Sequence, residues 1–510
     1  MKPSRLLITA ALAFALSPSF ATMHSHTPLG IFEHHQDVGD PTTPGSARYD
    51  ADTQTYTLTG AGENMWFGED QFHFAYQKLK GDFLIRATIE FVGKGSHEHR
   101  KIGIMARNDL SAASAHANAS VHGDTLTSLQ FRTAEGADTQ EVQLSVFHPT
   151  DIQFTRKGNV FTLSAAVLGE DFKSVSQQVD LHDEVYAGLF ICSHLADTTE
   201  TAIFRNVRII IPAEPDFVPY RDYLGSHIEI LNVHSGHRRI VHSENRSLQA
   251  PNWTPDGKFL IYNADGRMVR FDLASGKPEP LNTGPCIRNN NDHVLSWGGA
   301  QLGISHHVEP HWTSVIYTLP VDGSDEPTQI TDPSRGHSYL HGWSPDNREL
   351  LFTGERNGQY DIWKINIATG EETQLTNEPT LDDGAEYSPS GEWIYFNSVR
   401  TGTMQIWRMR ADGSDPEQVT FDAYNNWFPH ISPDGKWIVY LAYPPDIDPT
   451  DHPFYQHVYL RLMPAKGGVP RTIAYVYGGQ GTINVPSWSP CSQFVALVSN
   501  TRMDDSLAND

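Results

Sequence analysis

Histidine and carboxylate side chains recur at related positions in the C-terminal half of this sequence. His293 and His341 each stand two residues before a large apolar residue, and His430 and Glu386 each stand one residue before one. Imidazole nitrogens and carboxylate oxygens bind divalent cations, and both groups transfer protons near neutral pH. Residues such as His293, His341, His430 and Glu386 could therefore bind a divalent metal ion or share proton transfers if they converge on one face. The three histidines are equally well explained as hydrogen-bonded polar residues of the fold.

A second group of candidates lies in the neighbouring segments. It consists of His306, His307, His337, Arg356 and Arg400. One of the histidines could act as a general base, and either arginine could hold an anionic group of a substrate. Asp382, Asp383 and Asn425 stand close by, but such residues more often cap an incoming loop.

All these residues belong to a sequence unit that repeats from about residue 245. Each copy has an anchor residue, a turn related to Ser-Pro-Asp-Gly and then an apolar strand. The anchors are Trp253, Leu295, Trp343, Tyr387, Ile431 and Trp488, at intervals of 42, 48, 44, 44 and 57 residues. Four short strands joined by tight turns in a unit of this length predict one blade of a β-propeller. The six copies therefore predict six blades.

The last copy contains only two strands before the repeat region ends, and a matching strand pair precedes the first copy at residues 228–241. We expect the two ends of the region to complete one blade, which would close the ring and remove its open edges. In such a blade the first strand lines the central channel. The residues before each anchor and the loops between the second and third strands then share one face, which we predict to be the working face.

The elements Trp343-Ser-Pro-Asp346, Asp361-Ile-Trp-Lys364 and Asp412-Gly413 with Val419-Thr420 resemble the TolB-like propeller family, over roughly residues 222–502. The resemblance implies the fold, whereas propellers of this kind serve in protein docking, as accessory domains and as carbohydrate-active enzymes. A related architecture occurs in oligogalacturonate lyases, in which histidines at the channel mouth hold a metal ion that engages a uronate. By this resemblance one divalent metal ion (Mn²⁺, Ca²⁺ or Zn²⁺) would be held by His293, His341, His430 and Glu386. Arg356 or Arg400 would hold the substrate carboxylate, and one of His306, His307 and His337 would be the base.

Two functions follow from the resemblance. The first is an exported enzyme that acts on an oligo- or polysaccharide, as a metal-assisted lyase or as a hydrolase that uses Asp383 and Glu386. The alternative is a non-catalytic module, similar to TolB, that binds a periplasmic protein or a glycan. The abundance of histidine and carboxylate on the predicted working face favours the enzyme, because docking surfaces are usually rich in apolar anchors and arginine.

Residues 30–212 lack the repeat and show strands without helical periodicity, which predicts a separate β-sandwich. Gly81-Asp-Phe83, Ile102–Arg107, Tyr186-Ala-Gly-Leu189 and Phe204–Arg208 resemble a laminin-G or concanavalin-like jelly roll. That resemblance implies either carbohydrate binding or a plain structural appendage. Residues 213–223 are predicted to form a linker to the propeller at 224–502. The expected fold is all-β: a jelly-roll β-sandwich followed by a six-bladed β-propeller.

The N-terminus has the pattern of an export signal at residues 1–21. Lys2 and Arg5 precede the apolar run 6–16, and Ser19-Phe20-Ala21 forms a small-x-small cleavage site. Cleavage near Ala21 would place the protein in the periplasm or outside the cell. The net charge of -24 argues against nucleic-acid binding, and no segment has the ~20 apolar residues of a membrane span. The three cysteines are odd in number and far apart, so we expect no structural disulfide.

Overall fold

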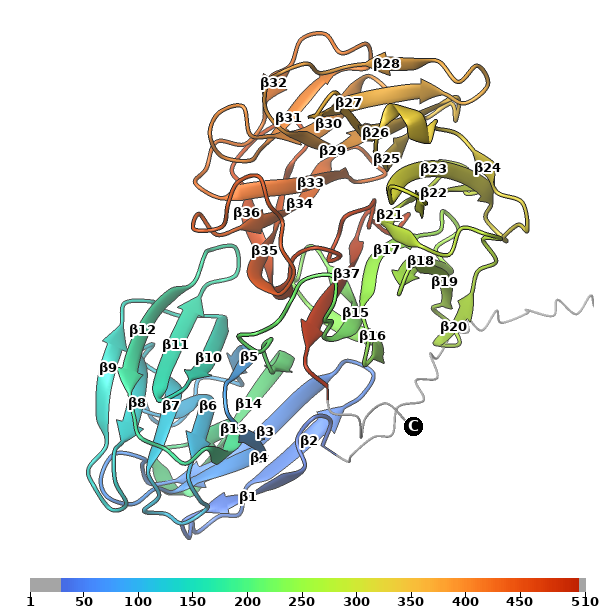
Figure 1. Cartoon of the computed structure of the whole chain (residues 1–510). Helices are drawn as coiled ribbons and strands as arrows, with labels where there is room; N and C mark the ends of the chain where they lie inside the picture. Colours follow the sequence, from blue (N-terminus) through green and yellow to red (C-terminus); the bar gives the residue numbers. More distant parts are fainter. Residues whose placement is uncertain (1–28, 504–510) are drawn as a thin grey trace, which may run out of the picture.

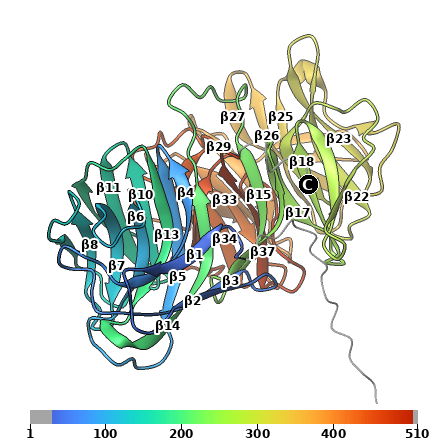
Figure 2. The ribbon, with the colours of Figure 1, turned by 90° about the horizontal axis from the view of Figure 1, so that it is seen from below.

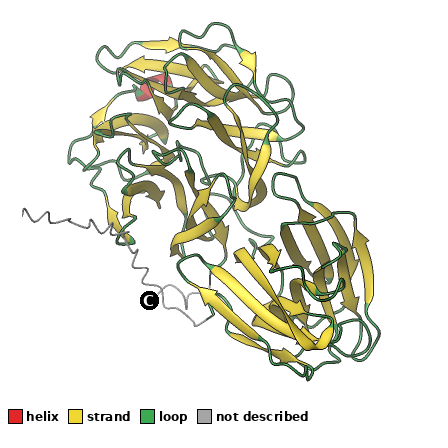
Figure 3. Ribbon diagram, turned by 180° about the vertical axis from the view of Figure 1, so that it is seen from behind, coloured by secondary structure: helices red, strands yellow, loops and turns green. Residues whose placement is uncertain are grey.

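The computed structural model describes residues 29–503, which form two β-domains side by side (Figure 1). The predicted export signal lies outside the described residues. The described chain contains 37 strands and one 3-10 helix, Pro333–Arg335 (Figure 3). Within residues 29–503 no helix is long and apolar enough to cross a membrane. Cys192, Cys286 and Cys491 are all unpaired.

The N-terminal domain consists of two seven-stranded antiparallel sheets. The first has the order β1 (His34–Val38), β4 (Phe72–Lys80), β13 (Glu184–Cys192), β6 (Lys101–Arg107), β7 (His116–His122), β8 (Thr127–Arg132) and β9 (Gln140–Leu144). The second has the order β12 (Lys173–Gln178), β11 (Val160–Ala166), β10 (Asp151–Lys157), β5 (Phe83–Phe91), β14 (Leu195–Ile210), β3 (Thr55–Gly62) and β2 (Ser46–Asp50).

One apolar core lies between these two sheets. Ile104 and Leu189 of the first sheet and Ile85, Phe154 and Leu163 of the second are fully buried in the same cluster. Strands that alternate apolar and polar residues bury one face against such a core and expose the other, which is why the sheets pair face to face. The strand pattern thus accounts for the two-sheet domain. The identification with a laminin-G or concanavalin-like jelly roll stays a prediction.

The C-terminal domain is a six-bladed β-propeller, as the repeat predicts. Five blades are four-stranded sheets whose strands follow chain order. The first blade has β17 (Leu248–Trp253), β18 (Phe259–Ala264), β19 (Arg267–Asp272) and β20 (Lys277–Pro280), and the second has β21 (Asn289–Leu295), β22 (Gln301–Val308), β23 (Thr313–Pro320) and β24 (Thr328–Gln329). The third has β25 (Ser338–Trp343), β26 (Glu349–Arg356), β27 (Gln359–Asn366) and β28 (Glu372–Gln374); the fourth has β29 (Asp382–Tyr387), β30 (Trp393–Ser398), β31 (Gln405–Arg410) and β32 (Glu417–Gln418); and the fifth has β33 (Asn425–Ile431), β34 (Trp437–Tyr443), β35 (Gln456–Pro464) and β36 (Arg471–Gly478).

The sixth blade joins the two ends of the repeat region, which confirms the predicted closure. Strand β37 (Phe494–Thr501) pairs along its whole length with β15 (Gly225–Asn232), which pairs in turn with β16 (Arg238–Glu244). A single bridge between Trp488 and Val495 stands in the place of the first strand of this blade. The ring therefore has no open edge between its first and last blades.

The repeated turns and anchors have clear physical roles. In the turn after Trp343, the Ser344 hydroxyl donates to Asp346 Oδ1 (2.6 Å) and accepts from the Arg348 and Glu349 amides. The Trp343 indole Nε1–H donates across to the Val294 carbonyl of the preceding blade (2.8 Å). The turn is thus fixed by local side-chain hydrogen bonds, while the anchor joins adjacent blades.

The two domains lie side by side (Figure 2), and charged side chains join them. Arg208 of β14 pairs with Glu229 of β15, with 2.5 Å between Nη2 and Oε2. Arg461 of β35 binds both carboxylate oxygens of Asp171 at 2.8 and 2.9 Å. Because each pair joins one domain to the other, the domains are held in a defined relative position.

Candidate functional site

The first strands of neighbouring blades contact one another around the propeller axis. These strands carry the four predicted metal ligands: His293 on β21, His341 on β25, Glu386 on β29 and His430 on β33. A metal ion requires ligand atoms that converge on one point. Among the described residues, these four do not form such a group.

His430 and Glu386 bind each other instead. His430 Nδ1 lies 2.7 Å from Glu386 Oε2, and its Nε2 contacts the Ile483 carbonyl. The other carboxylate oxygen of Glu386 accepts from the Ile431 amide at 3.2 Å. Both ring nitrogens of His430 are thus aimed at oxygens, so no nitrogen is presented to a metal ion. The pair ties neighbouring blades together.

His293 is fully buried and faces the preceding blade. Its Nε2 lies 3.1 Å from the Ile261 carbonyl, and its Nδ1 has no hydrogen-bond partner among the described residues. Burial lowers the pKa of His293 to about 4. A neutral, enclosed imidazole of this kind supports the hydrogen-bonded structural role.

The two predicted substrate-binding arginines are both held in ion pairs within their blades. Arg356 pairs with Glu372 at 3.2 Å and also donates to the His337 carbonyl. Arg400 pairs with the fully buried carboxylate of Asp382 at 2.8 Å, and its guanidinium lies over the Trp407 ring. Neither arginine is free to receive a substrate carboxylate without first breaking a buried pair.

The three predicted base histidines accept or contact local groups. His306 Nδ1 accepts from the Arg288 amide at 3.2 Å, and the ring of His307 stacks on Trp312 with its Nδ1 3.0 Å from the Trp312 carbonyl. His337 Nδ1 faces the Ser314 amide and the Tyr339 hydroxyl, each at 3.2 Å. His306 and His307 line a cavity of about 370 Å³ on the second blade. They therefore lie apart from the residues that surround His341.

A different set of three groups converges around His341. His341 Nε2 lies 3.1 Å from Asp383 Oδ1 of the next blade, and both side chains are largely buried. Asp383 Oδ1 also accepts from the Thr353 hydroxyl (2.6 Å) and the Gly384 amide (2.8 Å). Asp292, from the preceding blade, is close enough for its charge to act on His341. We call Asp292, His341 and Asp383 the axial triad, because they come from the first strands of three consecutive blades.

Burial and the interactions between neighbouring charges shift the pKa of each member of the axial triad. Burial raises the pKa of Asp292 to about 6, and the carboxylate of Asp383 adds to this rise while His341 opposes it. Burial would also raise the pKa of Asp383, but its hydrogen bond and charge interaction with His341 lower that pKa to about 2. Burial lowers the pKa of His341, but Asp383 and Asp292 outweigh burial and raise it. The site thus combines a stable ion pair with a carboxyl group that titrates near neutral pH.

Comparison with known proteins identifies the propeller half. Residues 313–446 match the family model for the TolB beta propeller domain. The chain is 45% identical over 274 residues to Uncharacterized protein Atu1656 of Agrobacterium fabrum, a match that spans 54% of this chain and 92% of that protein. The chain belongs to this TolB-like propeller family.

A solved structure agrees with this assignment. A protein from Agrobacterium tumefaciens, described as a candidate TolB, is 43% identical with a TM-score of 0.53, covering 55% of this chain and all of that one. An oligogalacturonate lyase from Vibrio parahaemolyticus is 11% identical with a TM-score of 0.36, covering 56% of this chain and 99% of that one. The second similarity is too low to say anything about substrate.

Two tyrosines lie within electrostatic reach of the axial triad of this TolB-like propeller. The carboxylates of Asp292 and Asp383 both act on the Tyr339 hydroxyl, and Asp292 also acts on Tyr220. Tyr220 belongs to the segment between the domains, is 69% exposed, and packs against Phe454 with ring centroids 5.2 Å apart. The connecting segment therefore brings an exposed ring within electrostatic reach of Asp292.

Sequence reasoning selected His341 but not Asp292, and it assigned Asp383 chiefly to loop capping. Asp292 lies in the polar run 289–293, where the adjacent histidine was the more conspicuous residue. The signal that could have found it is the recurrence of an acidic or imidazole group at the start of three consecutive blades. Direct recognition required the side-chain directions, which the sequence does not specify.

Proposed function

We propose that this TolB-like propeller is an exported carbohydrate-active enzyme whose reaction takes place at the axial triad by acid–base chemistry. The observation that carries the proposal is the position of Asp292, a carboxyl group with a pKa of about 6, within electrostatic reach of the His341–Asp383 ion pair. Neighbouring groups whose environments separate their pKa values are suited to distinct acid and base roles.

The surroundings favour a sugar as the substrate. Exposed tyrosine rings such as Tyr220 and Tyr360 offer flat faces on which a sugar ring packs, and the asparagine and threonine groups near the triad suit hydroxyl groups. A uronate, which carries a carboxylate, is the sugar that a lyase at this site would act on. In a lyase, Asp292 would take the proton beside that carboxylate once the pH exceeds about 6; in a hydrolase, protonated Asp292 would serve the leaving oxygen below that pH.

The metal-assisted form of this proposal is not supported by the residues at the propeller axis. His430 presents no nitrogen to an ion, and His293 is turned toward a backbone carbonyl. We therefore assign the reaction steps to Asp292 and His341 alone.

The test is a screen of acidic and neutral oligosaccharides with the full chain, with product detected both as ultraviolet absorbance and as new reducing ends. A lyase gives both signals, whereas a hydrolase gives only the second. We expect Asp292→Asn to lower kcat at least a hundredfold, because proton transfer is typically worth 10²–10⁴-fold. Asp446→Asn, at an exposed position on another loop, is the matched control. Full activity in Asp292→Asn would refute the assignment.

A non-catalytic binding module is the second candidate, and membership of the TolB-like family favours it. In that case a periplasmic protein or a glycan would bind to the axial face without turnover. Binding measured by calorimetry with no product formed, and with equal affinity in Asp292→Asn, would select this function over the enzyme.

A further inference from the structure

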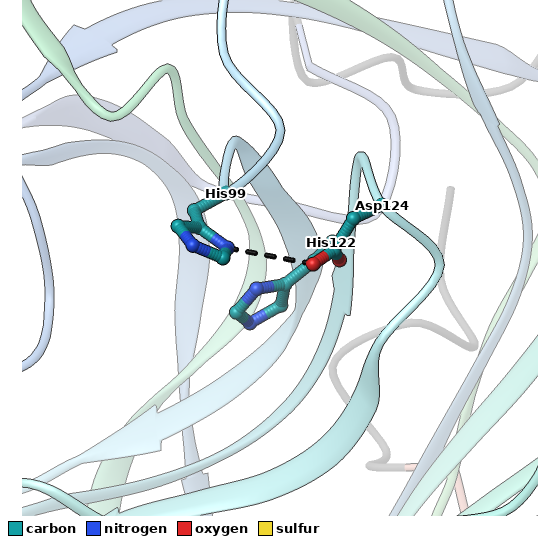
Figure 4. A group of neighbouring side chains, drawn as sticks. All are labelled: His99, His122 and Asp124. Atoms are coloured by element: carbon teal, nitrogen blue, oxygen red, sulfur yellow. Dashed lines mark ion pairs between the residues drawn. The ribbon is translucent and has the colours of Figure 1, made fainter.

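Four histidines gather at one end of the first sheet of the N-terminal domain, far in sequence from the propeller. They are His97, His99, His122 and His194, with Asp124 beside them. The rings of His97 and His194 stack with centroids 4.3 Å apart, and the ring of His99 lies 5.6 Å from that of His194 and 6.0 Å from that of His122. Figure 4 shows His99 and Asp124 facing each other above His122.

The sheet register brings these residues together. Lys101 at the start of β6 pairs with His122 at the end of β7 and with Cys192 at the end of β13. His99 precedes Lys101 by two residues, and His194 follows Cys192 by two. The segments that carry His99, His122 and His194 therefore lie side by side at the same end of three adjacent strands.

Backbone hydrogen bonds hold the loop of His99 against the turn of Asp124. The Asp124 amide donates to the Glu98 carbonyl (2.8 Å), and the Gly123 amide donates to the Arg100 carbonyl (2.9 Å). A buried ion pair between Arg100 and Glu200 (2.7 Å) fixes the loop to the second sheet. The positions of His99 and Asp124 are thus set by the fold before any ligand binds.

The ligand atoms are spaced as a metal ion requires. One ligand atom each of His99, His122 and Asp124 lies within 4.8 Å of the other two, and His99 Nδ1 is 3.5 Å from Asp124 Oδ2. Around a tetrahedral zinc ion with Zn–N distances near 2.0–2.1 Å, ligand atoms lie about 3.4 Å apart. The closest pair already has this spacing, and small side-chain rotations would bring in the third atom.

A buried nitrogen without a partner independently indicates a ligand. His122 is 6% exposed, and its Nδ1 has no hydrogen-bond partner among the described residues. Its Nε2 contacts the side-chain amide of Gln130 at 3.1 Å. The Gln130 atom at this contact is the amide nitrogen. A 180° flip of the Gln130 amide exchanges its oxygen and nitrogen, and it would make Nε2 the proton donor and leave the Nδ1 lone pair for a metal ion. An unpartnered buried nitrogen costs free energy unless something binds it.

The remaining histidines suit the same ligand. The Nδ1 of His194 is also buried without a hydrogen-bond partner among the described residues, and its ring lies 5.6 Å from that of His99. His194 can therefore bind as a fourth ligand after a small movement. Several imidazoles and one carboxylate are a donor set for zinc or a similar transition metal rather than for calcium or magnesium.

We propose that His99, His122 and Asp124 form a binding site for one divalent transition-metal ion, best matched to Zn²⁺. The ion would join the loop before β6 to the turn between β7 and β8. It therefore stabilises the N-terminal domain and lies outside the propeller and its axial triad.

Calorimetric titration of the untagged full chain with Zn²⁺ tests this site. We expect one ion per chain, and at least a tenfold loss of affinity in both His99→Ala and Asp124→Asn. These two side chains are 44% and 34% exposed, so their replacement leaves the fold intact, unlike that of buried His122. His148→Ala, at an exposed position of the same domain, and His341→Gln, in the axial triad, are matched controls that should bind as the wild type does.

A second readout separates the site from nonspecific binding to surface histidines. Co²⁺ in a site of this kind gives visible absorption bands of tetrahedral cobalt, and Zn²⁺ should raise the melting temperature of the wild type but not of His99→Ala. The proposal is overturned if the wild type binds no Zn²⁺, or if His99→Ala and Asp124→Asn retain the stoichiometry and affinity of the wild type. Loss of Zn²⁺ binding in His341→Gln with retention in His99→Ala would place the ion in the propeller instead.

Discussion

Replacement of Asp292 by asparagine should stabilise the propeller at neutral pH. Asp292 is 7% exposed, and burial raises the pKa of its carboxyl group from 3.8 to about 6. A shift of about two pKa units corresponds to about 3 kcal/mol of unfavourable free energy for the ionised form in the folded state. Asparagine has nearly the same shape and carries no charge, so it removes this cost. Asp292 also favours the charged form of His341, and we therefore expect a net gain of about 1–3 kcal/mol.

The gain should depend on pH in a defined direction. Between about pH 4 and pH 6 the folded protein keeps a proton on Asp292 that the unfolded chain releases, so the free energy of unfolding of the wild type falls as pH rises through this window. Asp292→Asn lacks this fall. The variant should therefore match the wild type at pH 4 and exceed it at pH 7.5.

Urea unfolding at these two pH values, followed by tryptophan fluorescence, provides the measurement. Ten of the eleven tryptophans lie between residues 253 and 488, so the signal reports mainly on the propeller. Asp446→Asn is the control for removal of one negative charge from an exposed position. A variant that is no more stable than the wild type at pH 7.5, or one with equal gains at both pH values, would show that Asp292 does not carry an elevated pKa.

Three further substitutions test contacts at the domain junction and beside the axial triad. Glu229→Gln leaves buried arginines without their partner and should cost about 3–5 kcal/mol in chemical denaturation; a loss below about 1 kcal/mol would show that the pair is dispensable. Asp171→Asn weakens the pair with Arg461 across the domain junction. Because Asp171 is 38% exposed, about 1 kcal/mol is expected, seen as faster hydrogen exchange in β35 alone, and unchanged exchange there would contradict it. Gly384→Ala places a Cβ against the Asn397 side chain at a φ of +66°. It should lower the free energy of unfolding by about 1–3 kcal/mol in chemical denaturation, whereas an unchanged value would show that the turn relaxes freely.

The propeller could be predicted from the sequence because its determinants are local. Each blade carries its own turn, in which a serine such as Ser344 and an acid such as Asp346 fix the chain reversal with their side chains. Because this signal is repeated in each copy of the unit, the copies can be counted from the sequence. The incomplete last copy and the strand pair before the first copy together predict the shared sixth blade, which the pairing of β37 with β15 confirms. The two facing sheets of the N-terminal domain also follow from alternating strands, since each strand must bury its apolar face.

The groupings of the functional side chains could not be predicted in the same way. The first strand of the third blade shifts register between Leu340 and Gly342, around His341, and the first strand of the fourth blade shifts between Asp383 and Glu386. Side chains of a strand alternate between its two faces, so a shift of one residue reverses the direction of everything beyond it. For this reason His341 meets Asp383, whereas Glu386 turns to His430, although all four stand before equivalent anchors.

The amino-acid sequence by itself determined the repeat, the number of blades and their closure, because these depend on patterns within a few tens of residues. Only the tertiary structure decided which polar groups meet. The axial triad depends on irregular strand registers in three blades, and the cluster of His99, His122 and Asp124 depends on the pairing of β6 with β7 and β13. Contacts between distant segments are set by how whole sheets align, and no single segment encodes that alignment.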